Sequence, residues 1–170
     1  MNLNGYPRIA IVGCPGSGKS TLAREIAART GHPVVHLDFE NWQPGWVPTP
    51  KEAFAARQRE RIQAERWIID GNYNGTMELR FAAADLVIVL DLPRLLCAGR
   101  VIRRHGTPRP DMPPGVEEGR VWSLDFLRFL LFIFEFKWFS RPKILRLHRK
   151  YPQVGFMRLR TRKAVRALLG

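Results

Sequence analysis

Apolar β-branched segments alternate with amphipathic helical segments along this chain of 170 residues. Five apolar segments predict strands, at positions 8–12, 34–37, 67–69, 86–90 and 154–159. The first four are almost continuously apolar, which is typical of strands covered on both faces of a sheet. The fifth alternates Met157 and Leu159 with Arg158 and Arg160, which predicts an edge strand.

Helical periodicity fills the intervals between these strands. The predicted helices are 20–29, 50–66, 93–104 and 161–169. Thr49 is the expected N-cap of the second and Pro50 its first helical residue. His105-Gly106 is expected to stop the third. Such alternation predicts an α/β fold, in which a parallel sheet carries helices on both faces. A chain of this length is most simply a single domain, residues 1–170.

The segment 124–139 is rich in Phe and Leu, but charges at Arg128, Glu135 and Lys137 interrupt it. It therefore falls short of the roughly 20 uncharged residues that a membrane-spanning helix needs. We expect a helix with a broad apolar face that contributes to the core or to a dimer contact. The chain is accordingly expected to be a monomer or a homodimer with no membrane partner.

A glycine-rich segment lies between the first predicted strand and the first predicted helix. The run Gly13-Cys14-Pro15-Gly16-Ser17-Gly18-Lys19-Ser20 fits the pattern GxxxxGK[ST] in full. Its backbone N–H groups can close around an anion at a helix N-terminus, where the helix dipole favours negative charge. In this pattern the lysine bridges the β- and γ-phosphates and the serine offers its hydroxyl to Mg²⁺. The sequence thus predicts a site for ATP and Mg²⁺ formed by Gly13, Cys14, Pro15, Gly16, Ser17, Gly18, Lys19, Ser20 and Thr21.

Three of the predicted strands end in aspartate, at Asp38, Asp70 and Asp91. Ligands of such sheets collect at the carboxyl ends of the strands. Asp70 has the setting of a Walker-B-like carboxylate, which orients Mg²⁺ through its waters. Asp38 is expected to contact an acceptor substrate or to act as its general base. Asp91 precedes Leu92-Pro93 and is expected to fix the strand end.

The net charge of +13 is concentrated in the second half of the chain. Residues 1–93 hold ten basic and ten acidic side chains, whereas residues 94–170 hold eighteen basic and five acidic ones. This asymmetry indicates a partner with phosphates, whether a nucleotide, a phosphorylated substrate or a nucleic acid. The two cysteines, Cys14 and Cys97, lack metal-ligand spacing and favour a reduced, cytoplasmic setting. The first seven residues lack the features of a secretion signal.

The segment 106–119 breaks the alternation, because it holds four prolines and three glycines. It follows a helix that carries Arg100, Arg103 and Arg104, so we predict a mobile lid over the phosphates at 105–119, with Arg109 on it. Earlier in the chain, Trp42 and Trp46 follow Asp38. They are expected either to stack on a flat acceptor or to pack their own loop down.

Several short motifs occur in an order typical of one family. They are the phosphate loop, His36-Leu37-Asp38, Trp42-Gln43-Pro44-Gly45-Trp46, Trp67-Ile68-Ile69-Asp70-Gly71-Asn72-Tyr73, Gly75-Thr76-Met77 with Arg80, and Arg109-Pro110-Asp111-Met112. The chain resembles the adenylate-kinase-like branch of the P-loop kinases and, more closely, the bacterial DNA topology modulation proteins (FlaR-like). The resemblance covers nearly the whole chain.

This resemblance implies a nucleoside-monophosphate-kinase-like P-loop fold of three layers, with a five-stranded parallel sheet, an acceptor-side region and a lid. It places Arg100 on the ATP base, Arg104 on a phosphate and Arg80 in the region that binds the acceptor's phosphate. With Lys19, Asp38 and Arg109, the arginines Arg100 and Arg104 form the predicted catalytic set, and Asp38, Trp42, Tyr73 and Arg80 form the predicted substrate site. Where adenylate kinases have Gly-Phe-Pro-Arg, this chain has Gly71-Asn72-Tyr73-Asn74, which argues against AMP as acceptor.

Two functions from different classes follow. The first is Mg²⁺- and ATP-dependent phosphoryl transfer to a small molecule, nucleotide or nucleoside-like, which the loop, the aspartates and the lid favour together. The second is an ATP-binding protein associated with nucleic acid, which would hold phosphates through the basic second half, including Arg158, Arg160 and Arg162. A nucleotide-binding switch with little turnover is a third. The chain lacks the guanine-reading Asn-Lys-x-Asp motif, which disfavours a GTPase.

Overall fold

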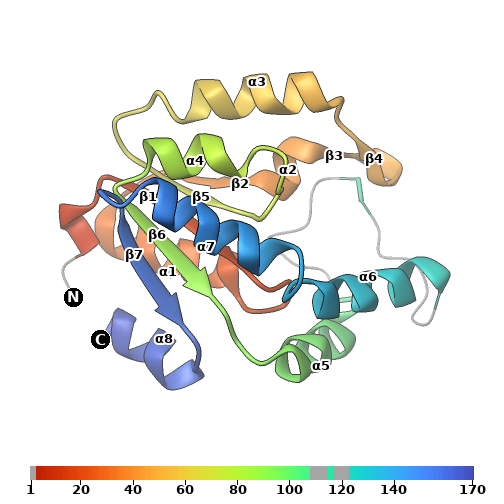
Figure 1. Cartoon of the computed structure of the whole chain (residues 1–170). Helices are drawn as coiled ribbons and strands as arrows, with labels where there is room; N and C mark the ends of the chain where they lie inside the picture. The colour runs from red at the N-terminus through yellow and green to blue at the C-terminus, as the bar shows by residue number, and fades with distance from the viewer. Residues whose placement is uncertain (1–2, 108–114, 117–122) are drawn as a thin grey trace.

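A five-stranded parallel sheet lies at the centre of the computed structural model, which describes residues 3–107, 115–116 and 123–170. Its strands are β1 (Arg8–Gly13), β2 (Val34–His36), β5 (Trp67–Asp70), β6 (Leu86–Leu90) and β7 (Gly155–Leu159). They lie in the order β2-β5-β1-β6-β7, and every neighbouring pair is parallel (Figure 1). The predicted α/β fold with its five-stranded parallel sheet is confirmed.

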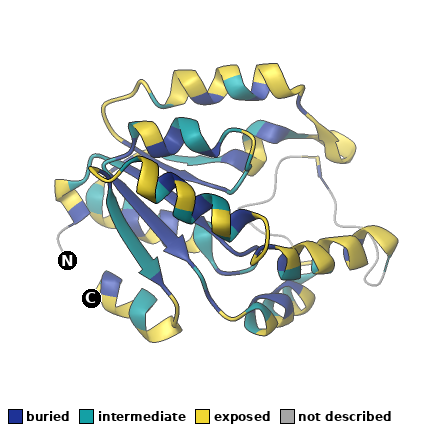
Figure 2. Cartoon of the chain, viewed as in Figure 1, coloured by how far each residue is buried: buried dark blue, intermediate teal, exposed yellow. Residues whose placement is uncertain are grey.

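Helices cover both faces of this sheet and make it the middle of three layers. On one face, Ile9 and Ile11 of β1 pack in a cluster with residues of α1 (Lys19–Thr30) and α8 (Arg162–Leu169). On the other, Ala10 and Val12 pack with α3 (Lys51–Arg61), α4 (Met77–Ala83), α5 (Arg94–Arg104), α6 (Leu124–Glu135) and α7 (Ser140–Lys150). Figure 2 shows the central strands buried between these layers. Continuous burial explains why the first four strands are apolar at nearly every position.

The edge position of β7 confirms the strand expected from its alternating sequence, because within the described part of the chain β7 pairs only with β6. Its Arg158 donates from Nε to Oδ2 of Asp91 at 2.8 Å, and the Nη2 atom of the same guanidinium contacts that oxygen as well. The Nε atom of Arg141 lies 3.6 Å from it. Asp91 therefore fixes the end of β6, as predicted, and ties it to β7 and α7.

Several boundaries differ from the sequence-based expectations. Helix α3 runs from Lys51 to Arg61, shorter than the predicted 50–66. Thr49 does not cap it, because the Thr49 hydroxyl donates instead to the carbonyl of Glu40 at 3.1 Å. Strand β2 ends at His36, and α2 (Leu37–Asn41) begins immediately afterwards, so Asp38 lies in the first turn of a short helix rather than at a strand end. Helices α4 and α7 were not among the predicted elements.

Smaller elements complete the described part. The 3₁₀ helix η1 (Leu3–Gly5) precedes β1. After α2, the strands β3 (Trp42–Gln43) and β4 (Val47–Pro48) pair antiparallel around the 3₁₀ helix η2 (Pro44–Trp46). The apolar segment after residue 123 forms α6, of which Phe126 and Ile133 are buried. Among the described residues, no helix is both long and apolar enough to cross a membrane. Most of the predicted lid at 105–119, including Arg109, lies outside the described residues.

Candidate active site

The phosphate loop joins β1 to α1 and requires glycine at defined positions. Gly13, Gly16 and Gly18 have φ values of 151°, 78° and 97°. A Cβ atom on Gly13 would lie 2.4 Å from the carbonyl oxygen of Leu90, and one on Gly16 would lie 2.6 Å from that of Cys97. The loop is thus pressed against β6 on one side and α5 on the other. Gly18 begins α1 without a side-chain cap, so the loop and the first helical turn present backbone N–H groups.

Lys19 and Ser17 supply the loop's polar side chains. The Nζ atom of Lys19 donates to the carbonyl oxygens of Gly13 and Cys14, each at 3.2 Å. Burial lowers the pKa of Lys19, while the charges of Asp70 and Asp38 act in the opposite direction. The Ser17 hydroxyl is buried and has no hydrogen-bond partner among the described residues. An unpartnered buried hydroxyl in this loop fits a site that binds an anion.

Cys14 contributes its backbone to this loop rather than its side chain. Its thiol is fully buried, and Sγ lies 3.7 Å from the carbonyl oxygen of Ile133 in α6. Cys97 of α5 is also a free buried thiol. The pKa of Cys14 is raised by its contact with Cys97 and by burial. A protonated thiol packed against helices belongs to the core, so only the peptide of Cys14 faces the cradle.

Ser20 and Asp70, the two residues predicted to serve Mg²⁺, are in direct contact. The Ser20 hydroxyl donates to Oδ2 of Asp70 at 2.8 Å, and Asp70 is only 4% exposed. Described residues form no cluster of three or more His, Cys, Asp or Glu that could hold a metal ion. The pairing of one serine hydroxyl with one carboxylate fits Mg²⁺ of the P-loop type, which takes one or two protein oxygens and completes its shell with phosphates and water.

His36 also contacts the Asp70 carboxylate, a feature that sequence reasoning missed. Its Nδ1 atom lies 2.5 Å from Oδ1 of Asp70. The signal for this contact is the strand register, since His36 of β2 stands directly opposite Asp70 of β5. The imidazole therefore holds the second carboxylate oxygen and leaves Oδ2 directed at Ser20.

On the acceptor side, Asp38 and Tyr73 come together as a pair. The Tyr73 hydroxyl donates to Oδ1 of Asp38 at 2.6 Å. Burial and the charge of Asp38 raise the pKa of Tyr73, so the phenol keeps its proton and fixes the carboxylate. The ring of Tyr73 packs on Phe54 of α3 at a centroid distance of 4.8 Å. Nearby, Trp42 and Trp46 meet edge to face at 5.5 Å, which supports the packing interpretation of these tryptophans.

Arg80 does not lie where an acceptor's phosphate could reach it, contrary to the role implied by the resemblance. The side chain is completely buried in α4. Its Nη2 atom donates to the carbonyl oxygens of Gly71 at 3.2 Å and Asn72 at 2.5 Å, and Nη1 contacts Oε1 of Gln58. Burial lowers its pKa. Its terminal nitrogens are thus used within the protein, and the sequence could not reveal this because it shows residue type rather than burial.

Two of the predicted catalytic arginines lie on α5 beside the phosphate loop. The Nη1 atom of Arg100 donates to the carbonyl oxygen of Ser17 at 3.1 Å. Burial and the neighbouring charges of Arg162 and Arg103 lower its pKa. The charge of Arg104 contributes to the lowered pKa of Lys19, which shows that the two cations share one electrostatic environment. Both arginines therefore add positive charge near the phosphate loop.

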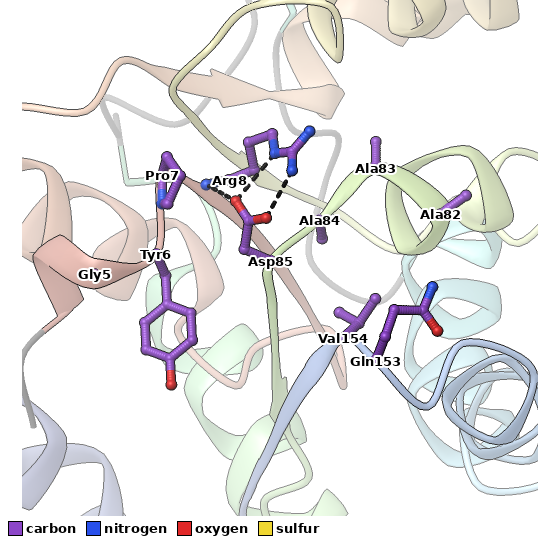
Figure 3. Close-up of a pocket in the computed structure, with 10 residues that line it drawn as sticks. All are labelled: Gly5, Tyr6, Pro7, Arg8, Ala82, Ala83, Ala84, Asp85, Gln153 and Val154. Carbon is purple, nitrogen blue, oxygen red and sulfur yellow. Dashed lines mark hydrogen bonds and ion pairs between the residues drawn. The ribbon is translucent and has the colours of Figure 1, made fainter.

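A hollow lies at the end of the sheet opposite the phosphate loop (Figure 3). Its volume is about 390 Å³, and it is lined by Gly5, Tyr6, Pro7, Arg8, Ala82, Ala83, Ala84, Asp85, Gln153 and Val154. Arg8 and Asp85 form a two-pronged ion pair there, with Nε–Oδ2 and Nη2–Oδ1 distances of 3.0 and 2.7 Å. This pair joins the starts of β1 and β6, remote from the carboxyl ends of the strands where such sheets bind ligands. The hollow therefore has a structural explanation.

Comparison with known proteins agrees with this geometry. A family model described as an AAA domain matches residues 8–40, which hold β1, the phosphate loop, α1 and β2. A shikimate kinase from Acinetobacter baumannii, solved with shikimate, superposes with a TM-score of 0.60 at 18% identity, over 98% of this chain and 90% of that one. The chain has the fold of the P-loop kinases.

Two further structures have the same fold. A shikimate kinase from Bacteroides thetaiotaomicron gives a TM-score of 0.56 at 16% identity, covering 96% of this chain and 94% of its own. An unliganded sugar kinase from Janibacter sp. gives 0.53 at 16% identity, covering 95% and 91%. No curated protein matches the chain. At these identities the likeness shows the fold, and the chemistry must be argued from the site itself.

Proposed function

We propose that the protein transfers the γ-phosphoryl group of MgATP to a hydroxyl group of a small molecule. This proposal rests on the arrangement at the phosphate loop. Ser20 donates a hydrogen bond to Asp70, and the charges of Asp70 and Asp38 both act to raise the pKa of Lys19. A phosphate cradle and a metal-type carboxylate account for a nucleotide. A second carboxylate, that of Asp38 on the acceptor side, adds the general base that transfer to another molecule requires.

The residues present fit ATP and Mg²⁺. The backbone of residues 13–20 would hold the polyphosphate, and Ser20 and Asp70 would serve the metal, whose role when bound is to neutralise charge on the β- and γ-phosphates. Lys19, Arg100 and Arg104 supply positive charge around the same region. Phosphoryl transfer depends mainly on positioning and charge neutralisation, and these side chains provide both.

The acceptor group is a hydroxyl rather than a phosphate. Asp38 carries negative charge and is oriented by Tyr73, so it can accept a proton from a hydroxyl but repels a phosphate. Arg80, the arginine expected to bind an acceptor phosphate, is buried and donates instead to backbone carbonyls of the protein. Arg57 and Arg61 of α3, two further arginines on the acceptor side, already donate hydrogen bonds to Glu40. A nucleoside-like or sugar-like molecule fits this chemistry, and the names of the structural neighbours, shikimate kinase and sugar kinase, agree with a small-molecule acceptor.

The test is a screen of nucleosides, sugars and polyols with γ-labelled ATP. We expect ADP to form only when an acceptor is present, with the label on the acceptor. Asp38→Asn should then lower kcat by about 10²- to 10⁴-fold through loss of the base, while the Kd for ATP changes little. Glu40→Gln is the matched control, since Glu40 lies on the same helix α2 but contacts α3. Absence of MgATP binding in calorimetry would remove the basis of the proposal.

A second candidate, association with nucleic acid, is favoured by a specific basic surface. Arg162, Lys163 and Arg166 of α8 are exposed, and Arg162 lies close enough to Arg100 to lower its pKa. Arg158, which was expected to contact nucleic-acid phosphates, pairs with Asp91 instead. If DNA or RNA binds here, affinity should fall steeply with salt and on replacing Arg162 and Lys163. ATP turnover that rises with DNA but yields no phosphorylated product would favour this candidate over the kinase.

A further inference from the structure

The carbonyl group of Gly13 accepts hydrogen bonds from two side chains. Lys19 donates from Nζ at 3.2 Å, and Asn72 donates from Nδ2 at 2.8 Å. Asn72 also accepts from the Gly13 N–H through Oδ1 at 2.9 Å. One side-chain amide from the loop after β5 thus holds both polar groups of the first residue of the phosphate loop. These contacts cross from one strand end to its neighbour, since β1 and β5 are paired.

The sharing of this carbonyl matters because Lys19 has a second task. In P-loop proteins this lysine binds the β- and γ-phosphates. A Lys19 ammonium that turns to a phosphate gives up the Gly13 carbonyl, and Gly13 is buried. A buried carbonyl left without a donor is costly. Asn72 removes that cost, because its own bond to the same oxygen is the shorter of the two and does not involve the ligand.

Arg80 fixes the backbone that presents Asn72. Its buried guanidinium donates to the carbonyl oxygens of Gly71 and Asn72, and its other terminal nitrogen contacts Gln58. The backbone here needs such support. Gly71 has φ of 136°, with its Cβ position 2.9 Å from the side chain of Leu37, and Tyr73 has φ of 42°. Non-glycine residues at positive φ persist only where their surroundings hold them.

We propose that Asn72 is a positioning residue for the nucleotide, held in place by Arg80, and that it secures the Gly13 peptide so that Lys19 can leave it for the phosphates. The inference rests on the proposed ATP site but adds a residue outside the GxxxxGK[ST] pattern to it. It also explains why the chain buries a guanidinium next to this loop: the charge serves the geometry of Asn72 rather than an acceptor.

The first experiment measures MgATP binding by calorimetry. Asn72→Ala should bind about 5-fold to 100-fold more weakly than the wild type, the range that an unpartnered buried carbonyl implies. Asn74→Ala is the matched control, because Asn74 lies in the same loop but donates to Ser140 instead, and it should bind as the wild type does. Asn72→Asp, which can still accept from the Gly13 N–H but cannot donate to its carbonyl, should also bind weakly.

The second experiment needs no nucleotide and so separates the two proposals. In the protein without ATP, Asn72→Ala removes the acceptor of the Gly13 N–H, but Lys19 still donates to the Gly13 carbonyl, so the melting temperature should fall only by what the loss of that N–H bond costs. In a Lys19→Met background the same change leaves the carbonyl with no side-chain donor and should lower it clearly more, giving a non-zero coupling in the double-mutant cycle.

Three results decide the matter. If the wild type binds no MgATP, the proposed function and this inference both fail. If the wild type binds but Asn72→Ala binds equally well, or if Asn74→Ala loses as much affinity, only this inference is overturned. If Asn72→Ala destabilises the protein equally with and without Lys19, Lys19 and Asn72 do not substitute for each other at the Gly13 carbonyl. The inference is then refuted, and Asn72 has a purely structural role.

Discussion

Two aspartate–arginine pairs link strands at opposite ends of the sheet, and their burial predicts very different contributions to stability. Asp91 pairs with Arg158 with side-chain exposures of 15% and 19%. Asp85 pairs with Arg8 with exposures of 27% and 42%. Replacing either aspartate by alanine leaves a guanidinium without its partner. At the first site that guanidinium is mostly buried, whereas at the second it can turn to water.

The magnitudes follow from this difference. Breaking a buried ion pair by removing one partner costs about 3–5 kcal/mol, and an exposed pair contributes at most about 1 kcal/mol. Since both Asp91 and Arg158 keep some contact with solvent, we expect Asp91→Ala to lower the free energy of unfolding by about 3 kcal/mol. Arg141, whose Nε atom is 3.6 Å from Asp91, adds to the loss. Asp85→Ala should cost about 1 kcal/mol for the ion pair and about 1 kcal/mol more because Oδ2 of Asp85 also accepts from the Arg8 backbone N–H at 2.9 Å.

Urea unfolding followed by circular dichroism measures both values. The same denaturation is repeated in about 1 M salt, which should reduce the effect of Asp85→Ala more than that of Asp91→Ala, because exposed charges are screened more. Equal losses for the two variants, or a larger loss for Asp85→Ala, would show that burial does not govern these pairs and would refute the reasoning.

Four further outcomes are expected. Arg8 holds the pKa of Asp85 below its ordinary value. The contribution of this pair to stability is therefore present above about pH 4 and is lost as the pH falls below that value. In acid unfolding curves, the stability difference between wild type and Asp85→Asn should shrink below about pH 4. Ser20→Ala should raise the Mg²⁺ concentration needed for half-maximal turnover by about tenfold or more, with the fold intact by circular dichroism. Gly16→Ala should abolish measurable ATP binding in calorimetry, because the new Cβ would collide with the Cys97 carbonyl at a φ that alanine disfavours. Arg100→Met should raise the KM for ATP several-fold with a smaller change in kcat, measured by steady-state kinetics.

The sheet could be predicted from sequence because its signal is local. Strands such as β6 are apolar at every position, and that pattern follows directly from burial on both faces. The Ser20–Asp70 contact was also within reach, since residues at the ends of adjacent parallel strands and loops meet at one edge. Short helices gave weaker signals: α4 has only seven residues, and α7 carries Pro142 and a run of basic side chains.

What sequence reasoning missed depends on contacts between distant segments. Arg80 carries the residue type of a phosphate ligand, yet its neighbours Gln58 and Asn72 decide that it serves the interior. His36 has no local pattern that marks it, and only the register of β2 against β5 brings it to Asp70. Asn72 belongs to the motif at 67–73, but its bonds to Gly13 could not be predicted, because they join two loops that lie 59 positions apart in the sequence.

The hairpin made of β3, η2 and β4 stands outside the five-stranded sheet, and its exposed residues include Trp46 and Val47. The phosphate loop, by contrast, starts at the innermost strand and is braced by both neighbouring strands. Residues 43–48 can therefore be exchanged without disturbing the phosphate loop, whereas Trp42 also interacts with Tyr73. If the protein is the kinase proposed above, changes of acceptor are best sought in this hairpin, which reaches the acceptor side through Trp42 and Tyr73 and lies outside the central sheet.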